Sequence, residues 1–172
     1  MITESIKAKI IDELARVEED SVYSAKSHFN ASDRWSSYHY WLGVPSVVLS
    51  IVAGATIPTK ASWIATIASI GAAALTSLIT FLKPSETATQ HKSSGDQYLG
   101  LRNDARILRE VSLLVLETDA QALEALNALT TRRTELNTVS RQPSRKDFAL
   151  ARDGIEKGEA KHAIDVKNGG ES

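Results

Sequence analysis

Apolar residues of this chain are concentrated in its middle part. Residues 41–59 and 61–82 form two apolar stretches, and the one ionisable side chain between their outer ends is Lys60. Each stretch reaches about the roughly 20 residues that a helix needs to cross some 30 Å of hydrocarbon. We therefore predict two transmembrane helices, joined by a tight Pro-Thr-Lys turn at residues 58–60.

Helical periodicity continues on both sides of this apolar block. Before it, apolar residues recur at helical steps at Ile6, Ile10, Ile11, Leu14 and Val17. Behind it, steps of three and four residues relate Tyr98, Leu101, Ala105, Leu108, Ser112 and Val115, and a further stripe contains Leu123, Leu126, Leu129, Leu136 and Val139. No segment alternates with period two, so the sequence predicts no β-sheet.

Proline and capping residues predict where the helices end. Pro84 indicates a stop or kink after the second apolar stretch, with Ser85 or Thr87 as the N-cap of the next helix. Another helix is expected to start at Thr118. Residues 141–144, which include a proline, are expected to end this helix and to separate it from the C-terminal helix.

These patterns predict an all-α fold: a two-helix transmembrane hairpin with a cytoplasmic helical bundle formed by the N-terminal and C-terminal helices. The expected parts are an N-terminal cytoplasmic amphipathic helix at residues 1–40 and the hairpin at residues 41–82. Cytoplasmic helices follow at residues 83–142, and a polar C-terminal helix and tail at residues 143–172.

The composition argues against several classes of function. The formal net charge is −1, so no direct nucleic-acid binding is expected, and zero cysteines exclude a disulfide scaffold and a thiolate metal site. The four histidines lack the helical spacing of metal ligands, and we interpret His39 and His91 as polar residues at the membrane interface. Because no phosphate loop, nucleophile elbow or HExxH motif occurs, we expect no enzyme, no metal and no cofactor.

Positive charges predict the orientation in the membrane. Those near the apolar stretches lie on the side of the chain ends, at Lys26, Arg34, Lys83, Lys92 and Arg102, against Lys60 alone in the turn. Cationic loops stay in the cytoplasm, so both termini are expected on the cytoplasmic side of a bacterial inner membrane. The residues expected at the membrane interface are Trp35, Tyr40, Trp41, Trp63 and Lys83.

Small and hydroxyl side chains follow one line along the second apolar stretch. Ser62, Thr66, Ser69, Ala73, Thr76 and Thr80 are separated by steps of three and four residues. At 100° per residue these positions share one helix face. The stripe is either a packing seam or the lining of a water-filled path, and both interpretations hold if the seam opens.

The first apolar stretch has a related pattern. Ser46, Ser50 and Gly54 have the small-xxx-small spacing of close helix packing, against the second stretch or a neighbouring subunit. Pro45 is expected in the first turn of this helix, where the missing donor costs little. Neither stretch contains an ionisable side chain within its apolar span, which argues against a coupled transporter.

The charged residues outside the membrane are unevenly distributed. Acidic residues outnumber basic ones in residues 1–20, whereas basic residues outnumber acidic ones in residues 132–153. Both segments are ordinary solvated helix faces, or the basic segment docks an acidic helix, an anionic headgroup or a phosphorylated ligand.

Short motifs on either side of the hairpin resemble a known family. ASDRW at residues 31–35 and YWLGVP at residues 40–45 lead into the first stretch, TFLKPSE at residues 80–86 ends the second, and YLGLR follows at residues 98–102. In this order they resemble the SLATT domain, a bacterial two-transmembrane effector associated with nucleotide-second-messenger synthases. The likeness covers about residues 20 to 140.

The resemblance implies a membrane effector of antiphage defence. Such a protein self-associates on a cytoplasmic trigger and permeabilises the inner membrane, which arrests growth or kills the infected cell. The implied partners are the lipid bilayer, further copies of the chain, and a nucleotide second messenger or a separate sensor protein. The alternative function is a non-conducting, membrane-anchored helical scaffold that recruits a cytoplasmic partner; a phage holin fits less well because much of the chain is cytoplasmic helix.

Overall fold

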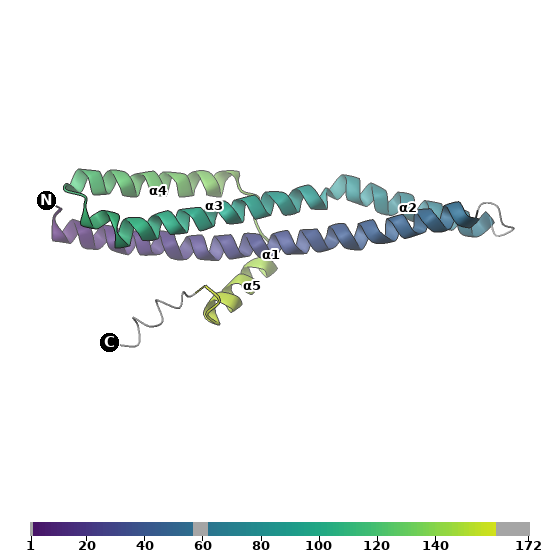
Figure 1. Ribbon diagram of the computed structural model, residues 1–172, viewed down its shortest axis with the longest axis horizontal. Helices are drawn as coiled ribbons and strands as arrows, with labels where there is room; N and C mark the ends of the chain where they lie inside the picture. Colours follow the sequence, from purple (N-terminus) through teal and green to yellow (C-terminus); the bar gives the residue numbers. More distant parts are fainter. Residues whose placement is uncertain (1, 57–61, 161–172) are drawn as a thin grey trace. The chain divides into compact units, whose positions relative to one another are not determined.

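The computed structural model describes residues 2–56 and 62–160, and this part of the chain is helical, without strands (Figure 1). The elements are α1 (Glu4–Thr56), α2 (Ser62–Leu82), α3 (Pro84–Glu110), the 3₁₀ helix η1 (Ser112–Leu114), α4 (Asp119–Val139) and α5 (Arg145–Glu156). The prediction of an all-α fold is confirmed. The predicted turn at residues 58–60 and the tail at residues 161–172 lie outside the described residues.

The chain forms two compact units. One consists of Met1–Ala31 together with Gln90–Ser172, and the other of Ser32–Thr89. Helix α1 contributes residues to both units. We describe each unit separately.

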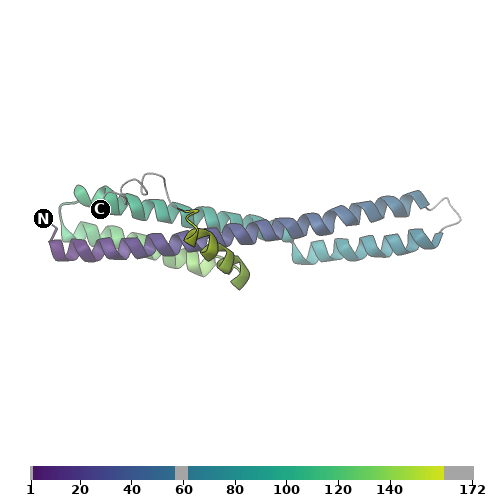
Figure 2. The same cartoon turned by 90° about the horizontal axis from the view of Figure 1, so that it is seen from below.

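In the first unit, the N-terminal part of α1 lies beside α3, and α4 runs along them (Figures 1 and 2). Their common core contains Ile10, Leu14, Val17, Ala25, Tyr98, Leu101, Ala105, Leu108, Leu113, Ala122 and Leu136. The predicted stripes of α1 and α3 therefore form the core, because apolar residues at steps of three and four meet along helices that lie side by side.

Two of the predicted stripes extend further than the buried faces do. Helix α3 ends at Glu110, so Ser112 and Val115 do not continue its seam, and Val115 is 74% exposed. On α4 the core side chains are Ala122 and Leu136, whereas Leu123 and Val139 are exposed. The predicted stripe of α4 is thus only partly buried, and Ala122 beside Leu123 lies in the core.

The starts of α4 and α5 agree with the sequence signals. Thr118 caps α4 in a capping box with Gln121, and Ser144 caps α5 in the same way with Asp147. In each box two backbone donors at the helix start, which no helical carbonyl can reach, receive side-chain acceptors. Local chemistry therefore sets these boundaries.

The junction of α2 and α3 differs from the prediction. Pro84 is the first residue of α3, so Ser85 and Thr87 lie inside the helix and neither caps it. Proline suits this first position because its missing N–H would have no helical partner there. Lys83, the single residue between the helices, has a φ of 46°, a left-handed conformation that is uncommon for a side-chain-bearing residue.

In the second unit, the C-terminal part of α1 lies beside α2 (Figures 1 and 2). Pro45 was expected in the first turn of a helix, and this prediction was wrong. It lies inside α1, which runs without interruption to Thr56. The helix therefore lacks the hydrogen bond that an amide at position 45 would donate to the carbonyl of Trp41.

Candidate functional site

Small side chains join α1 and α2 in the second unit. Ser46 and Ala53 on α1, and Ala65, Ala68 and Ala72 on α2, are each at most 9% exposed. A Cβ added at Gly71 would lie 3.0 Å from Leu49 Cδ1, which marks a further close approach. Because these side chains are small, the two backbones can pack closely. The face of α2 that meets α1 is thus an alanine seam.

The predicted hydroxyl stripe lies beside this seam. The described side chains of the stripe, Thr66, Ser69, Ala73, Thr76 and Thr80, are all exposed, whereas the side chain of Ser62 lies outside the described part. Thr80 Oγ1 donates back to the Thr76 carbonyl at 2.9 Å. Such back-bonding keeps a hydroxyl compatible with an apolar medium. The single chain therefore does not cover its stripe.

Hydroxyls of both helices gather on one side of the pair. Ser46 Oγ and Thr76 Oγ1 lie 2.9 Å apart, and Ser50 Oγ donates to the Ser46 carbonyl at 2.9 Å. Of the predicted ridge on α1, Ser46 meets α2, while Ser50 and Gly54 are exposed. Nothing lies within 4 Å of a Cβ built on Gly54.

Large apolar side chains occupy the other side. At 100° per residue, Val48 and Val52 on α1 and Ile67 and Leu78 on α2 lie across the seam from the hydroxyls. All four are exposed. The helix pair thus has one hydroxyl side and one bulky apolar side.

The predicted interface residues lie inside α1, at Trp35, Tyr40 and Trp41, and at the two ends of α2, at Trp63 and Lys83. Tyr40, Trp41 and Trp63 are 67%, 78% and 65% exposed, and Trp35 is partly buried. The Arg34 guanidinium lies 5.5 Å from the centre of the Trp35 ring. Lys83 pairs with Glu86 at 3.1 Å. These amphipathic groups have the chemistry of a membrane interface, where rings and charges can both be accommodated.

The first unit contains a histidine pair that sequence reasoning missed. His28 and His91 are 3% and 2% exposed, and their Nδ1 atoms are 3.1 Å apart. In this hydrogen bond one Nδ1 donates and the other accepts. The accepting Nδ1 carries no proton, so at least one of the two imidazole rings is neutral. Burial, and secondarily the charge of His91, lowers the pKa of His28 from 6.5 to about 4. The interpretation of His91 as an interfacial residue was wrong.

A signal for this pair was present in the sequence. Counting back from Tyr98 in steps of four and three gives Ser94 and His91, and the α1 stripe continues from Ala25 to His28. Both histidines therefore lie on faces already assigned to the core. Among the residues described, no group of three or more His, Cys, Asp and Glu side chains could hold a metal ion.

The buried pair leads to a testable pH dependence. An unfolded His28 takes up a proton near pH 6.5, but the folded one does so only near pH 4, so stability falls as the pH drops through this window. When the pH is lowered from 7 to 5, the titration of His28 should decrease the free energy of unfolding by about 2 kcal/mol. Denaturant titrations of the detergent-solubilised protein at both pH values measure the decrease.

The control for this prediction is His28→Gln, which removes the titrating group from the core. Its pH dependence should be smaller than that of the wild type by the same amount. An equal decrease in both proteins would contradict the assignment to His28.

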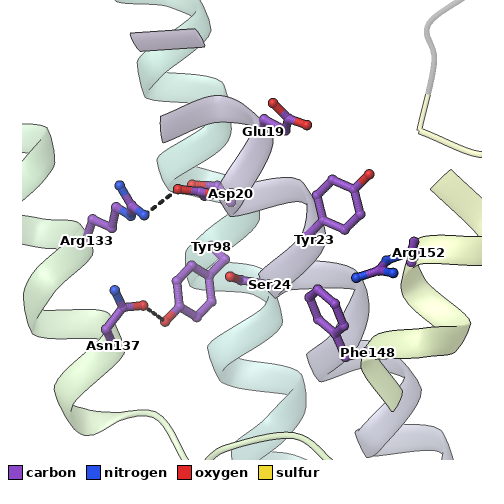
Figure 3. A pocket seen from close by; sticks show the side chains of 10 residues that line it. Glu19, Asp20, Tyr23, Ser24, Tyr98, Arg133, Asn137, Phe148 and Arg152 are labelled. Carbon is purple, nitrogen blue, oxygen red and sulfur yellow. Dashed lines mark hydrogen bonds and ion pairs between the residues drawn. The ribbon is translucent and has the colours of Figure 1, made fainter. Parts of the chain in front are cut away.

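A polar pocket of about 380 Å³ in the first unit tests the interpretation of the charged segments (Figure 3). Arg133, from the basic segment, forms an ion pair with Asp20 of the acidic N-terminal segment. Tyr98 Oη donates to Asn137 Oδ1 at 2.7 Å, and the Arg152 guanidinium lies 5.4 Å from the Phe148 ring. At Arg133, therefore, the basic segment docks an acidic helix, one of the alternatives left open by the sequence.

Comparison of the chain with protein-family models, with curated proteins and with solved structures gives no significant match.

Proposed function

We propose that the chain is a two-pass protein of the bacterial inner membrane whose copies assemble with their hydroxyl sides around a water-filled path. Both termini face the cytoplasm in this proposal. The assembled protein permeabilises the membrane and performs no enzymatic reaction.

The observation that carries the proposal is the two-sided surface of the α1–α2 pair. A helix pair surrounded by lipid alone gains nothing from collecting its hydroxyls on one side. The stripe of α2 is exposed, and the hydrogen bond between Ser46 and Thr76 brings the hydroxyls of α1 to the same side. A polar path needs such a lining, and the bulky side then points away from the path.

Length and exposure support the membrane location. Two helices of the described chain are long and apolar enough to cross a membrane. In their most apolar windows only 11% and 17% of the residues are buried, whereas the core helix of a soluble protein is mostly buried. Helix α2 has 21 residues and therefore spans about 30 Å, the thickness of the hydrocarbon layer.

Energetics favour several copies over one. Ala, Ser and Thr contribute less to insertion into lipid than Leu, Ile or Phe, so α2 inserts weakly for its length. Covering the stripe with further copies offsets this weakness. Hydrogen bonds between helices contribute only about 0.6 kcal/mol each on average, so several must form together.

The resemblance to the SLATT domain gives the biological setting of the proposal. The protein is an effector of antiphage defence that opens on a cytoplasmic trigger and stops the growth of the infected cell. The trigger is a nucleotide second messenger or a separate sensor protein, and it acts on the first unit.

Ion flux tests this function directly. Purified protein in liposomes of bacterial lipids is expected to release an entrapped dye or ions at a rate that rises steeply with the protein-to-lipid ratio. The assay is run alone and with candidate nucleotides. Protein that inserts, as alkaline extraction shows, but leaves the vesicles sealed under all these conditions would refute the proposal.

A membrane-anchored scaffold remains the second candidate. It is favoured by exposed apolar side chains of the first unit near the end of α3, where Val111, Leu114 and Val115 are 57%, 73% and 74% exposed. A scaffold would keep its cellular activity when residues 41–56 and 62–82 are replaced by polyleucine helices. A permeabilising protein would lose it.

A further inference from the structure

We propose that neighbouring copies contact each other head to tail, with Leu78 and Ile67 on α2 of one copy seated at Gly43 and Gly54 on α1 of the next. This inference rests on the proposed function, because it assumes that the helix pair is embedded in a membrane. It identifies the surfaces that build the assembly.

The receiving surface is an apolar groove on α1. It has a volume of about 460 Å³ and is lined by His39, Tyr40, Gly43, Val44, Val47 and Val48. Gly43 has no neighbouring atom within 4 Å of a built Cβ. Gly54, about three turns further along the helix, is equally open. Two glycines therefore leave hollows on the same face of α1, since eleven residues correspond to about three helical turns.

The inserting surface is a ridge on α2. Ile67 and Leu78 are 61% and 45% exposed, and they too are separated by about three turns. Ala74 lies between them and is exposed. The ridge therefore alternates large, small and large side chains.

The two surfaces match in depth. The contact of Ser46 with Thr76 and the approach of Leu49 to Gly71 determine how the antiparallel helices are aligned. With this alignment, Gly43 is level with Leu78 and Gly54 is level with Ile67. Between them, Val47 is level with Ala74. Each hollow of α1 thus has a large side chain at its own depth on α2, and the large Val47 has a small one.

Equal depth matters because of the symmetry of a membrane assembly. Copies related by rotation about the membrane normal keep every residue at a constant depth. Consequently, a contact between copies can join only residues that are already level within one copy. The alternation of large and small side chains meets this condition at three successive levels.

The two surfaces also point in opposite directions. On α1, Gly43 and Gly54 lie about 80° around the helix from Ser46 and Ala53 of the seam. On α2, Ile67 and Leu78 lie about 120° from the seam alanines. Because the helices are antiparallel, these rotations carry the two surfaces to opposite faces of the helix pair. The ridge of one copy therefore reaches the groove of the next copy and cannot reach its own. A head-to-tail contact of this kind closes into a ring when the rotation permits it.

This arrangement leaves the hydroxyl stripe of α2 free. The stripe of α2 lies to one side of the line that joins ridge and groove, and Val52 of α1 lies to the other. In a closed ring the first side faces the centre. Lipid chains filling the groove would not require the matched depths, so a second copy is the occupant that fits.

Disulfide cross-linking tests the contact, and the chain suits it because it contains no cysteine. Gly43→Cys or Gly54→Cys in one copy is combined with Leu78→Cys or Ile67→Cys in another, and the co-expressed chains are oxidised in membranes. The depth-matched combinations, Gly43 with Leu78 and Gly54 with Ile67, should form several-fold more dimer than the two mismatched ones. A chain carrying both matched cysteines should form a ladder of multimers.

Other results would overturn the proposal. Dimers formed by a single variant alone would indicate a two-fold contact between identical surfaces. The absence of cross-links in all four combinations, at expression levels that permit leakage, would show that lipid covers the groove. Leakage measured on the same membranes separates the hypotheses, because leakage without cross-links refutes this contact alone, and cross-links without leakage refute the water-filled path.

Discussion

Thr66→Leu combined with Thr76→Leu is expected to reduce leakage from liposomes to the background of protein-free vesicles. Both side chains belong to the exposed stripe of α2. Two leucines at these positions would replace a hydroxyl lining by an apolar constriction in every copy, and narrow apolar constrictions exclude water and ions. Dye release and ion flux at matched protein-to-lipid ratios measure the effect.

The variant should still enter the membrane. Leucine inserts more favourably than threonine, so alkaline extraction should recover as much inserted protein as for the wild type. The change also removes the hydrogen bond between Ser46 and Thr76, but a bond of this kind contributes only about 0.6 kcal/mol on average. Loss of leakage would therefore not result from separation of the two helices.

Thr66→Ser combined with Thr76→Ser is the matched control. It keeps both hydroxyls and removes only methyl groups, so leakage should persist. Undiminished leakage in the leucine variant would show that the stripe does not line the path, and equal loss in both variants would point to packing instead of polarity.

Leu101→Ala is expected to lower the free energy of unfolding of the first unit by about 2–5 kcal/mol. The side chain is fully buried in the core that α1, α3 and α4 share. Its removal leaves a cavity that helices tied at several positions cannot close by moving together. Denaturant titration followed by circular dichroism of the solubilised protein measures the loss.

Leu99→Ala is the matched control for this substitution. Leu99 lies two residues away on the same helix and is 38% exposed, so its truncation removes less buried surface and should cost well below half as much. Similar losses in the two variants would contradict the core assigned here.

Several features of the fold could be predicted because they depend on neighbours in sequence. The caps at Thr118 and Ser144 act within three residues of themselves, and periodicity placed Leu101 and Leu14 on buried faces. The predictions failed at positions whose structure depends on contacts with residues far away in the sequence. Pro45 was placed at a helix start, yet α1 continues through it. Leu123 belongs to the predicted stripe of α4 but is exposed, whereas Ala122 is buried.

The candidate site was predictable only in part. The hydroxyl stripe of α2 is visible in the sequence, since periodicity identifies residues that share a face. Periodicity does not say which face meets the other helix. The alanine face and the hydroxyl face lie next to each other on α2, and the alanine face, with Ala65, Ala68 and Ala72, is the one that packs against α1.

By itself, the sequence determined the helical class, the two apolar stretches and the residues that share each face, because these properties follow from local chemistry and helical repeat. Only the tertiary structure decided that the alanine face forms the seam, that Ser46 meets Thr76, and that His28 meets His91. Such pairings join residues far apart in the chain, and they depend on how closely side chains of particular sizes allow two helices to approach.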